Sequence, residues 1–250
     1  MQFNKDAPAG YLVKTTLVDY PGRLASAFFL YGCNLRCPYC YNTDLVNNSE
    51  KEEAVSVSEL YSHLEKRKNV LSGLVLSGGE ALLFPGLKEI IEKAKSLGYK
   101  IKLDTNGTLP EKLSELIKNP DTKPDYIAMD IKTSPQNYSV LLGNKKEPSE
   151  NSEKINNELE NKICKSINIL SELPPEEREF RTVLVPPLVK LEDIQNISKL
   201  LPENATWFLA SFKNENCLNH FYETINPYTE NEEKELLKEA QKIIKNTSIR

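Results

Sequence analysis

The sequence predicts an α/β fold in which short parallel strands alternate with amphipathic helices. Three observations predict it: short apolar segments recur along the 250 residues, turn residues bound each segment, and a stretch with helical periodicity follows each one. Strand–helix alternation repeated six times implies a parallel sheet with right-handed crossovers, either open or curled into a barrel. Hydrophobic residues make up 39% of the chain, which is enough for a substantial core.

The predicted strands are continuous apolar runs, as expected of strands that are buried on both faces. Residues 10–24 come before them, and the turn sequence Asp-Tyr-Pro-Gly at residues 19–22 predicts a hairpin there. The six parallel strands are expected at residues 26–31, 74–77, 100–105, 126–131, 180–185 and 206–212.

The helices between these strands are indicated by apolar stripes that recur every three or four residues. A capping box at Ser56 to Glu59 starts the first helix. Residues 143–157 are polar and rich in lysine and asparagine, so they are expected to form an exposed loop before a long helix. The later helices are expected around residues 87–97, 155–170, 191–201 and 236–244.

Composition argues against several classes of protein. The net charge is −4 and no basic block stands out, so a nucleic-acid partner is not expected. The longest apolar stretch, residues 25–31, is far too short to cross a bilayer, and no signal peptide opens the chain. Five cysteines, three of them clustered, do not form the pattern of a secreted disulfide framework, so a cytoplasmic protein is predicted.

The most informative feature is the run of three cysteines, Cys33, Cys37 and Cys40, which directly follows the first parallel strand. Iron–sulfur cubes normally take four protein thiolates. Three thiolates with no local fourth ligand predict a [4Fe–4S] cluster that keeps one iron open. An open position is what distinguishes a catalytic metal site from a structural one.

Three other readings of the cysteines remain open from spacing alone. The spacing i, i+4, i+7 would place all three on one face of a helix, but Gly32 and Pro38 argue against a helix here. Cys37 and Cys40 alone match a thiol–disulfide CxxC motif. A zinc site is the third reading, although His63 and His220 lie far away in the sequence.

Polar motifs follow the other predicted strands at their carboxyl ends, where ligands bind in parallel α/β folds. They are Ser77–Glu80, Asp104–Gly107, Met129–Lys132 and the segment from Arg181 to Pro186. The first three have an ordinary alternative: a tight turn for the glycines of the first, a turn before a helix for the second, and a structural ion pair for the third. Their joint position at one rim favours a functional site.

Together with residues 19–22, 27–32 and 41–42, these motifs resemble the radical SAM (S-adenosylmethionine) superfamily, and within it the activases of glycyl-radical enzymes. Residues 207–213 and 227–229 resemble most closely the anaerobic ribonucleoside-triphosphate reductase activating proteins. The resemblance covers residues 10–228. It implies a partial (β/α)6 barrel, similar to a TIM barrel, with an N-terminal hairpin and a C-terminal helix. A single domain over residues 1–250 is expected, with a core at about 20–215 and an extension at 216–250.

The resemblance implies a role for each motif. Cys33, Cys37 and Cys40 would ligate three irons, and the fourth iron would bind the amine and carboxylate of SAM. Tyr39 would lie near the adenine. Arg181 would contact the SAM carboxylate, a contact that guanidinium geometry favours.

Gly78 and Gly79 have no side chains, so their backbone groups would be accessible to a ligand. Glu80 would supply the negative charge that binds the SAM ammonium. Asp130 and Lys132 match an Asp-x-Lys motif of the family that helps to place SAM and the substrate loop.

Three further positions match the place where related activases hold a monovalent cation beside SAM: Asp104, Thr105 and Met129. Carboxylate, hydroxyl and backbone carbonyl oxygens suit such a hard ion. Asp104, Thr105 and Asn106 are also expected to contact SAM.

The implied reaction is that of an oxidoreductase. One electron, from a flavodoxin- or ferredoxin-like donor, would split SAM into methionine and a 5′-deoxyadenosyl radical. That radical would take a hydrogen atom from a glycine of a partner enzyme, with anaerobic ribonucleotide reductase as the expected partner. The alternatives are a radical SAM enzyme acting on a small molecule, similar to 7-carboxy-7-deazaguanine synthase, and a CxxC thiol–disulfide oxidoreductase.

The sequence departs from the activase pattern at two positions. Tyr41 stands where many activases have histidine, and Ala81 stands where proline often follows the Gly-Gly-Glu motif. Two cysteines lie outside the motif. Cys164 is expected in the core on its helix, and Cys217 is expected to be an exposed thiol.

Overall fold

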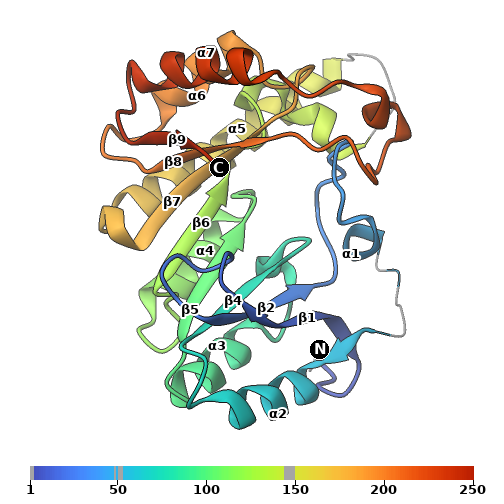
Figure 1. Cartoon of the computed structure of the whole chain (residues 1–250), viewed down its shortest axis with the longest axis vertical. Helices are drawn as coiled ribbons and strands as arrows, with labels where there is room; N and C mark the ends of the chain where they lie inside the picture. The colour runs from blue at the N-terminus through green and yellow to red at the C-terminus, as the bar shows by residue number, and fades with distance from the viewer. Residues whose placement is uncertain (1–2, 48, 50–52, 144–149) are drawn as a thin grey trace. The chain divides into compact units, whose positions relative to one another are not determined.

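The computed structural model describes residues 3–47, 49, 53–143 and 150–250 (Figure 1). They form two compact units. The first comprises Met1–Asn34, Asp44–Thr105 and Glu111–Ile127, and the second comprises Leu35–Thr43, Asn106–Pro110 and Ala128–Arg250.

The first unit is built on a sheet with the strand order β3-β1-β2-β4-β5. β1 runs antiparallel to β2 and β3, which confirms the predicted N-terminal hairpin. β2, β4 and β5 are parallel. These strands are β1 (Pro8–Thr16), β2 (Ala25–Leu30), β3 (Val55–Ser56), β4 (Gly73–Gly78) and β5 (Lys100–Thr105).

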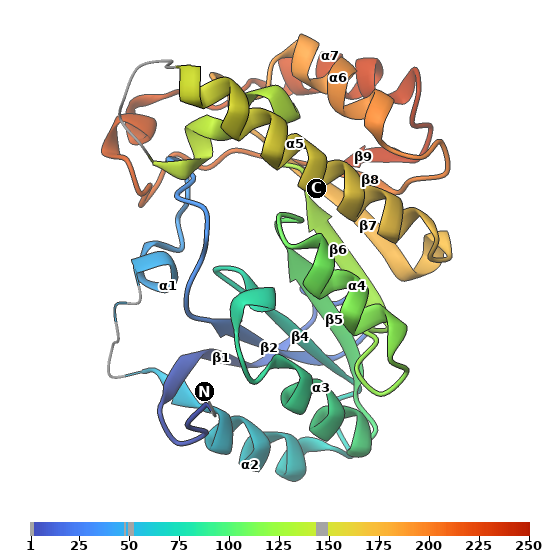
Figure 2. The same ribbon diagram turned by 180° about the vertical axis from the view of Figure 1, so that it is seen from behind.

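Helices cover one face of this sheet, and α2 and α3 run along the same side of it in Figures 1 and 2. The predicted capping box is present at the start of α2, where Ser56 and Glu59 bond each other's backbone N–H groups. Leu60, Leu64 and Ile90 are completely buried on the inner faces of these helices. The helical segments of the unit are α1 (Thr43–Asn47), α2 (Val57–Arg67), η1 (Ala81–Leu83), α3 (Leu87–Ser96) and α4 (Pro110–Lys118).

The other face of the first sheet carries a hydrophobic cluster around a buried tyrosine. Tyr20, from the turn between β1 and β2, packs with Ala25, Ala27 and Val75. Gly73 makes room for it, because a Cβ at this position would lie 2.8 Å from the Tyr20 ring. Burial raises the pKa of Tyr20 to about 12, with a further contribution from the nearby Asp125. The Asp-Tyr-Pro-Gly turn therefore serves the core of this unit.

The second unit has the strand order β6-β7-β8-β9, and β7, β8 and β9 are parallel. Figures 1 and 2 show α6 and α7 side by side along β8 and β9. The strands are β6 (Tyr126–Asp130), β7 (Arg178–Leu184), β8 (Trp207–Ser211) and β9 (Thr247–Ile249). The helical segments are η2 (Pro135–Leu142), α5 (Glu150–Ser171), η3 (Pro175–Glu177), α6 (Leu191–Leu200), η4 (His220–Thr224) and α7 (Glu230–Gln241).

The predicted alternation of strands and helices is confirmed, with one correction. The long helix α5 begins at Glu150, so the polar residues 150–157 belong to the helix and not to a loop. Residues 144–149 of the predicted loop lie outside the described residues. In the part of the chain that the structure describes, we find no helix long and apolar enough to cross a membrane.

Candidate functional site

The Gly-Gly-Glu motif at the end of β4 is bonded to the end of β2, where the cysteine run begins. The Gly79 N–H donates to the Leu30 carbonyl at 3.0 Å, and the Glu80 N–H donates to the Gly32 carbonyl at 2.8 Å. Both glycines permit this approach. A Cβ at Gly79 would lie 2.1 Å from the Gly32 oxygen, and Gly78 has a φ of +121°, which favours glycine. The motif thereby fixes the backbone that carries Cys33.

We expect Gly79→Ala to destabilise this junction strongly. The added methyl group would meet the Gly32 carbonyl at 2.1 Å and the Cys33 Cβ at 3.1 Å, so the backbone must shift. Overpacking of this kind costs about 3 kcal/mol, or roughly 6–12 °C in Tm. Gly98→Ala is the control, because only backbone strain opposes it (φ +89°, with no atom within 4 Å of the new Cβ). The Tm and the iron content after reconstitution should both fall in Gly79→Ala, whereas Gly98→Ala should keep its iron content.

Two polar groups lie at the carboxyl ends of β4 and β5 in the first unit. Thr105 donates its hydroxyl to Glu80 Oε1 at 2.9 Å, and the Leu82 N–H donates to the same oxygen at 3.1 Å. Asp104 accepts from the Ser77 hydroxyl at 2.9 Å and pairs with Lys102 at 2.5 Å. The structure therefore joins Glu80 with Thr105, and it joins Asp104 with Ser77 and with Lys102, which was not predicted as a site residue.

The part of the cysteine loop in the second unit is held by a segment that follows β8. The Leu218 N–H donates to the Cys40 carbonyl and the Asn219 N–H donates to the Pro38 carbonyl, both at 2.9 Å. A tight turn closes the loop, with the Cys40 N–H bonded to the Cys37 carbonyl at 3.0 Å. Cys217 lies next to this anchor and is only 2% exposed, so its predicted exposure was wrong.

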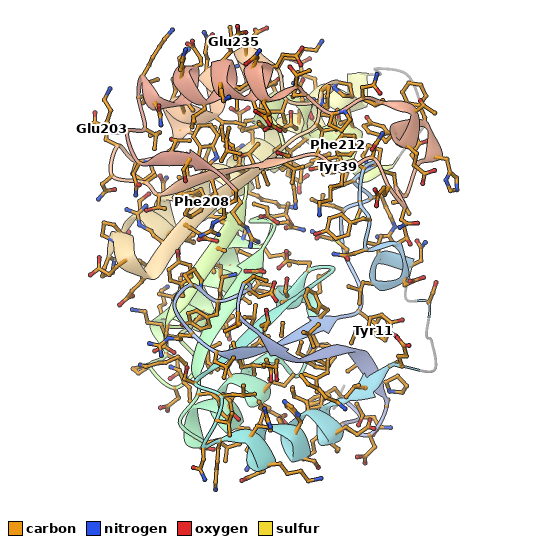
Figure 3. All side chains as sticks on the ribbon, in the orientation of Figure 1. Tyr11, Tyr39, Glu203, Phe208, Phe212 and Glu235 are labelled. Carbon is orange, nitrogen blue, oxygen red and sulfur yellow. The ribbon has the colours of Figure 1, made fainter. Side chains whose placement is uncertain are left out.

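Tyr39, between two of the cysteines, is buried among aromatic rings. Its ring centroid lies 6.4 Å from that of Phe212 and 6.5 Å from that of Tyr222, and Figure 3 shows Tyr39 beside Phe212. Its hydroxyl is buried and has no hydrogen-bond partner among the described residues. Burial raises the pKa of Tyr39 well above its usual value. A buried polar atom of this kind is typical of a site that receives a further group.

Asp130 at the end of β6 lies between two cations. Its carboxylate accepts from Lys132 Nζ at 2.8 Å and from Arg181 Nε at 2.7 Å. Burial alone would raise the pKa of Asp130, but the charges of Arg181 and Lys132 hold it well below the usual range. For Lys132, burial would lower the pKa, but Asp130, with Tyr39 and Cys37, raises it well above the usual range.

Backbone hydrogen bonds fix the position of this ion-pair group. The Ile131 N–H donates to the Arg181 carbonyl at 2.8 Å, and the Thr182 hydroxyl donates to the Ile131 carbonyl at 2.8 Å. Tyr138, which is completely buried, accepts from the Lys132 N–H at 3.0 Å. Tyr138 was not predicted from the sequence, because its position in a 3-10 segment gives no periodic signal.

The remaining predicted residues have local partners. Asn106 accepts from the backbone and hydroxyl of Thr108 at 3.0 and 2.6 Å, which shapes the turn before α4. Met129 is buried, and its methyl group fills the space beside Gly107, where a Cβ would lie 2.1 Å from Met129 Cε.

The donor set fits an iron–sulfur cluster in its chemistry. All five cysteines lie within the described residues and none is in a disulfide. Cys33 belongs to the first unit, and Cys37 and Cys40 belong to the second. Within the described residues, no three His, Cys, Asp or Glu side chains stand as a ready-made metal-binding group. Three thiols on one loop, whose backbone is hydrogen-bonded within each unit, are the donors that suit an iron–sulfur cluster.

Comparison with known proteins agrees with this chemistry. Residues 28–179 match the family model of the radical SAM superfamily. A Methanocaldococcus jannaschii protein, assigned provisionally as a glycyl-radical enzyme activating enzyme, is 32% identical over 96% of this chain and 94% of its own. The pyruvate formate-lyase-activating enzyme of Clostridium pasteurianum is 33% identical over 51% of this chain and 53% of its own.

The chain is also similar to a solved structure of TYW1, with a TM-score of 0.57 and 17% identity over 87% of this chain and 73% of that one. Likeness at this level concerns the fold, and it confirms the predicted fold class, the partial (β/α) barrel of radical SAM proteins. The chain belongs to the radical SAM superfamily, whose members use a [4Fe–4S] cluster and S-adenosylmethionine.

Proposed function

We propose that this radical SAM enzyme generates a glycyl radical on a partner enzyme, and that the partner is an anaerobic ribonucleoside-triphosphate reductase. The observation that carries the activase proposal is the end-to-end similarity to a relative assigned to that activity. The match of residues 207–213 and 227–229 to the reductase-activating branch supports the choice of partner. A flavodoxin- or ferredoxin-like donor and a cytoplasmic location belong to the same proposal.

The thiolates of Cys33, Cys37 and Cys40 would hold the cluster. When bound, the cluster and SAM supply a one-electron reductive cleavage that yields a 5′-deoxyadenosyl radical. Hydrogen bonds at Leu30 and Gly32 on one side, and at Pro38 and Cys40 on the other, fix the backbone that carries these thiols. Backbone hydrogen bonds thus help to order the loop without using the thiols.

Two charged residues and one tyrosine would bind SAM. Glu80 is 1% exposed and would receive the SAM ammonium. The Arg181 Nε–H donates to Asp130, which holds the guanidinium in one orientation. The remaining N–H donors of the guanidinium can then meet the SAM carboxylate. Tyr39 would present its buried hydroxyl and ring toward the nucleoside.

Electron paramagnetic resonance tests the proposal directly. Cluster-loaded, reduced protein and SAM are mixed anaerobically with the reductase, and a doublet from the glycyl radical is expected together with 5′-deoxyadenosine. A reductase whose acceptor glycine is replaced by alanine serves as the control and should give no doublet. Steady SAM cleavage driven by a bound small molecule, with no protein radical, would instead identify the small-molecule branch of the superfamily.

A further inference from the structure

A buried lysine occupies the middle of β5 in the first unit. The side chain of Lys102 is 3% exposed and that of its partner Asp104 is 15% exposed, and their charged atoms lie 2.5 Å apart. An ammonium group is seldom buried in a protein unless an opposite charge accompanies it. This ion pair is therefore a built part of the site and not a surface contact.

Strand geometry explains how the lysine fits. Lys102 and Asp104 are two residues apart on β5, so their side chains lie on the same face of the sheet. Lys102 is opposite Val75 on β4, which is in turn opposite Ala27 on β2. Neither Val75 nor Ala27 carries a charge, so neither can pair with the lysine.

The family resemblance assigns two residues at this end of β5, Asp104 and Thr105, to a free monovalent cation. Each already has a partner within the first unit. Asp104 accepts hydrogen bonds from Lys102 at Oδ1 and from the Ser77 hydroxyl at Oδ2. The Thr105 hydroxyl donates a hydrogen bond to Glu80. A free cation at Asp104 would lie beside the Lys102 ammonium and would be repelled by it. The residues present do not fit a free cation.

We propose that the Lys102 ammonium is the built-in cation of this site. It supplies the positive charge at Asp104 that related activases obtain from a bound K⁺ or Na⁺, so this chain needs neither ion. Lys102 is a positioning residue, because it acts on the site through Asp104. Its effect on SAM rests on the proposed function, whereas the absence of a cation requirement can be measured on the protein without SAM or cluster.

The test replaces Lys102 by methionine, which keeps the length of the side chain and removes its charge. Lys100→Met is the matched control, since Lys100 lies on the same strand, is about half exposed and pairs with Asp125 at 2.7 Å. Thermal unfolding of the cluster-free proteins is measured in KCl, NaCl and choline chloride at a matched ionic strength of about 0.1 M. We expect Lys102→Met to lose about 10 °C in choline chloride and to regain several degrees in KCl or NaCl.

The unfolding temperature of the wild-type protein should not change between the three salts, and neither should that of Lys100→Met. A specific response of the wild-type protein to K⁺ or Na⁺ would overturn the proposal, as would a variant that responds equally to all three salts. If Lys102→Met does not fold, binding of Rb⁺ to the wild-type protein by equilibrium dialysis decides: no stoichiometric binding is expected, and one bound ion per chain would refute the proposal. SAM cleavage by the loaded proteins, measured in the same salts, then tests the link to the proposed function separately.

Discussion

Replacing Cys37 by alanine will leave reconstituted protein without a [4Fe–4S] cluster and reduce 5′-deoxyadenosine release to background. The reason is that the cube would keep only two of its three protein thiolates, and no other cysteine belongs to the motif. Protein loaded anaerobically with iron and sulfide and reduced with dithionite provides the assay. Iron content, visible absorbance and 5′-deoxyadenosine are measured on the same sample.

Cys164→Ala is the matched control for this experiment. Cys164 lies in α5, outside the cysteine loop, and burial raises the pKa of its thiol, as expected of a packing residue. The control should load iron and cleave SAM as the wild-type protein does. Full iron loading of Cys37→Ala would contradict the assignment of this thiol, and CxxC redox activity that survives without iron would favour the oxidoreductase alternative.

The second large effect is expected from Asp130→Asn. This change leaves the Lys132 and Arg181 charges, which are 19% and 25% exposed, without their shared carboxylate. Removal of one partner from such a group costs about 3 kcal/mol, or roughly 6–12 °C in Tm. SAM binding should weaken as well, because an uncharged amide holds the Arg181 guanidinium less firmly than the carboxylate does. Glu115→Gln breaks the surface pair with Lys88 instead and should change stability by less than about 1 kcal/mol.

The effect of Asp130→Asn should depend on pH. The pKa of Asp130 is lower in the folded protein than in the unfolded chain, so its contribution to stability is present above the unfolded pKa of about 4 and is lost as the pH falls. Denaturant unfolding of wild type and variant should therefore differ most at neutral pH, and the two curves should converge in acid. A difference that stays constant down to the acid limit would exclude this ion-pair explanation.

Much of the fold could be predicted because most of its strands are long enough to appear in the sequence as apolar runs. The prediction for residues 100–105 matches β5 residue for residue. β3 and β9 are two and three residues long, so they exist only through pairing with other strands and leave no pattern of their own. The start of α5 was missed for a related reason, since residues 150–157 carry few apolar side chains to mark a helix face.

The site shows the same limit. Motifs at strand ends revealed Asp130, Lys132 and Arg181, and the structure joins them into one ion-pair group. Lys102 was not predicted, although a lysine two residues before an aspartate in the middle of a strand was a usable signal. The loop anchor at Leu218 and Asn219 could not have been found this way, because its contacts are made by backbone atoms and depend on no particular side chain.

The anchor of the cysteine loop also sets an order of events during synthesis. The carbonyl groups of Pro38 and Cys40 accept their hydrogen bonds from residues about 180 positions later in the chain. A ribosome needs roughly 10–40 s to make that length, so the loop emerges long before its support exists. The thiols then remain on an unsupported segment, exposed to oxidation, until residues 218 and 219 have been made. Cluster insertion is thus expected to follow synthesis of residue 219, and truncation before residue 218 should yield protein that holds iron poorly.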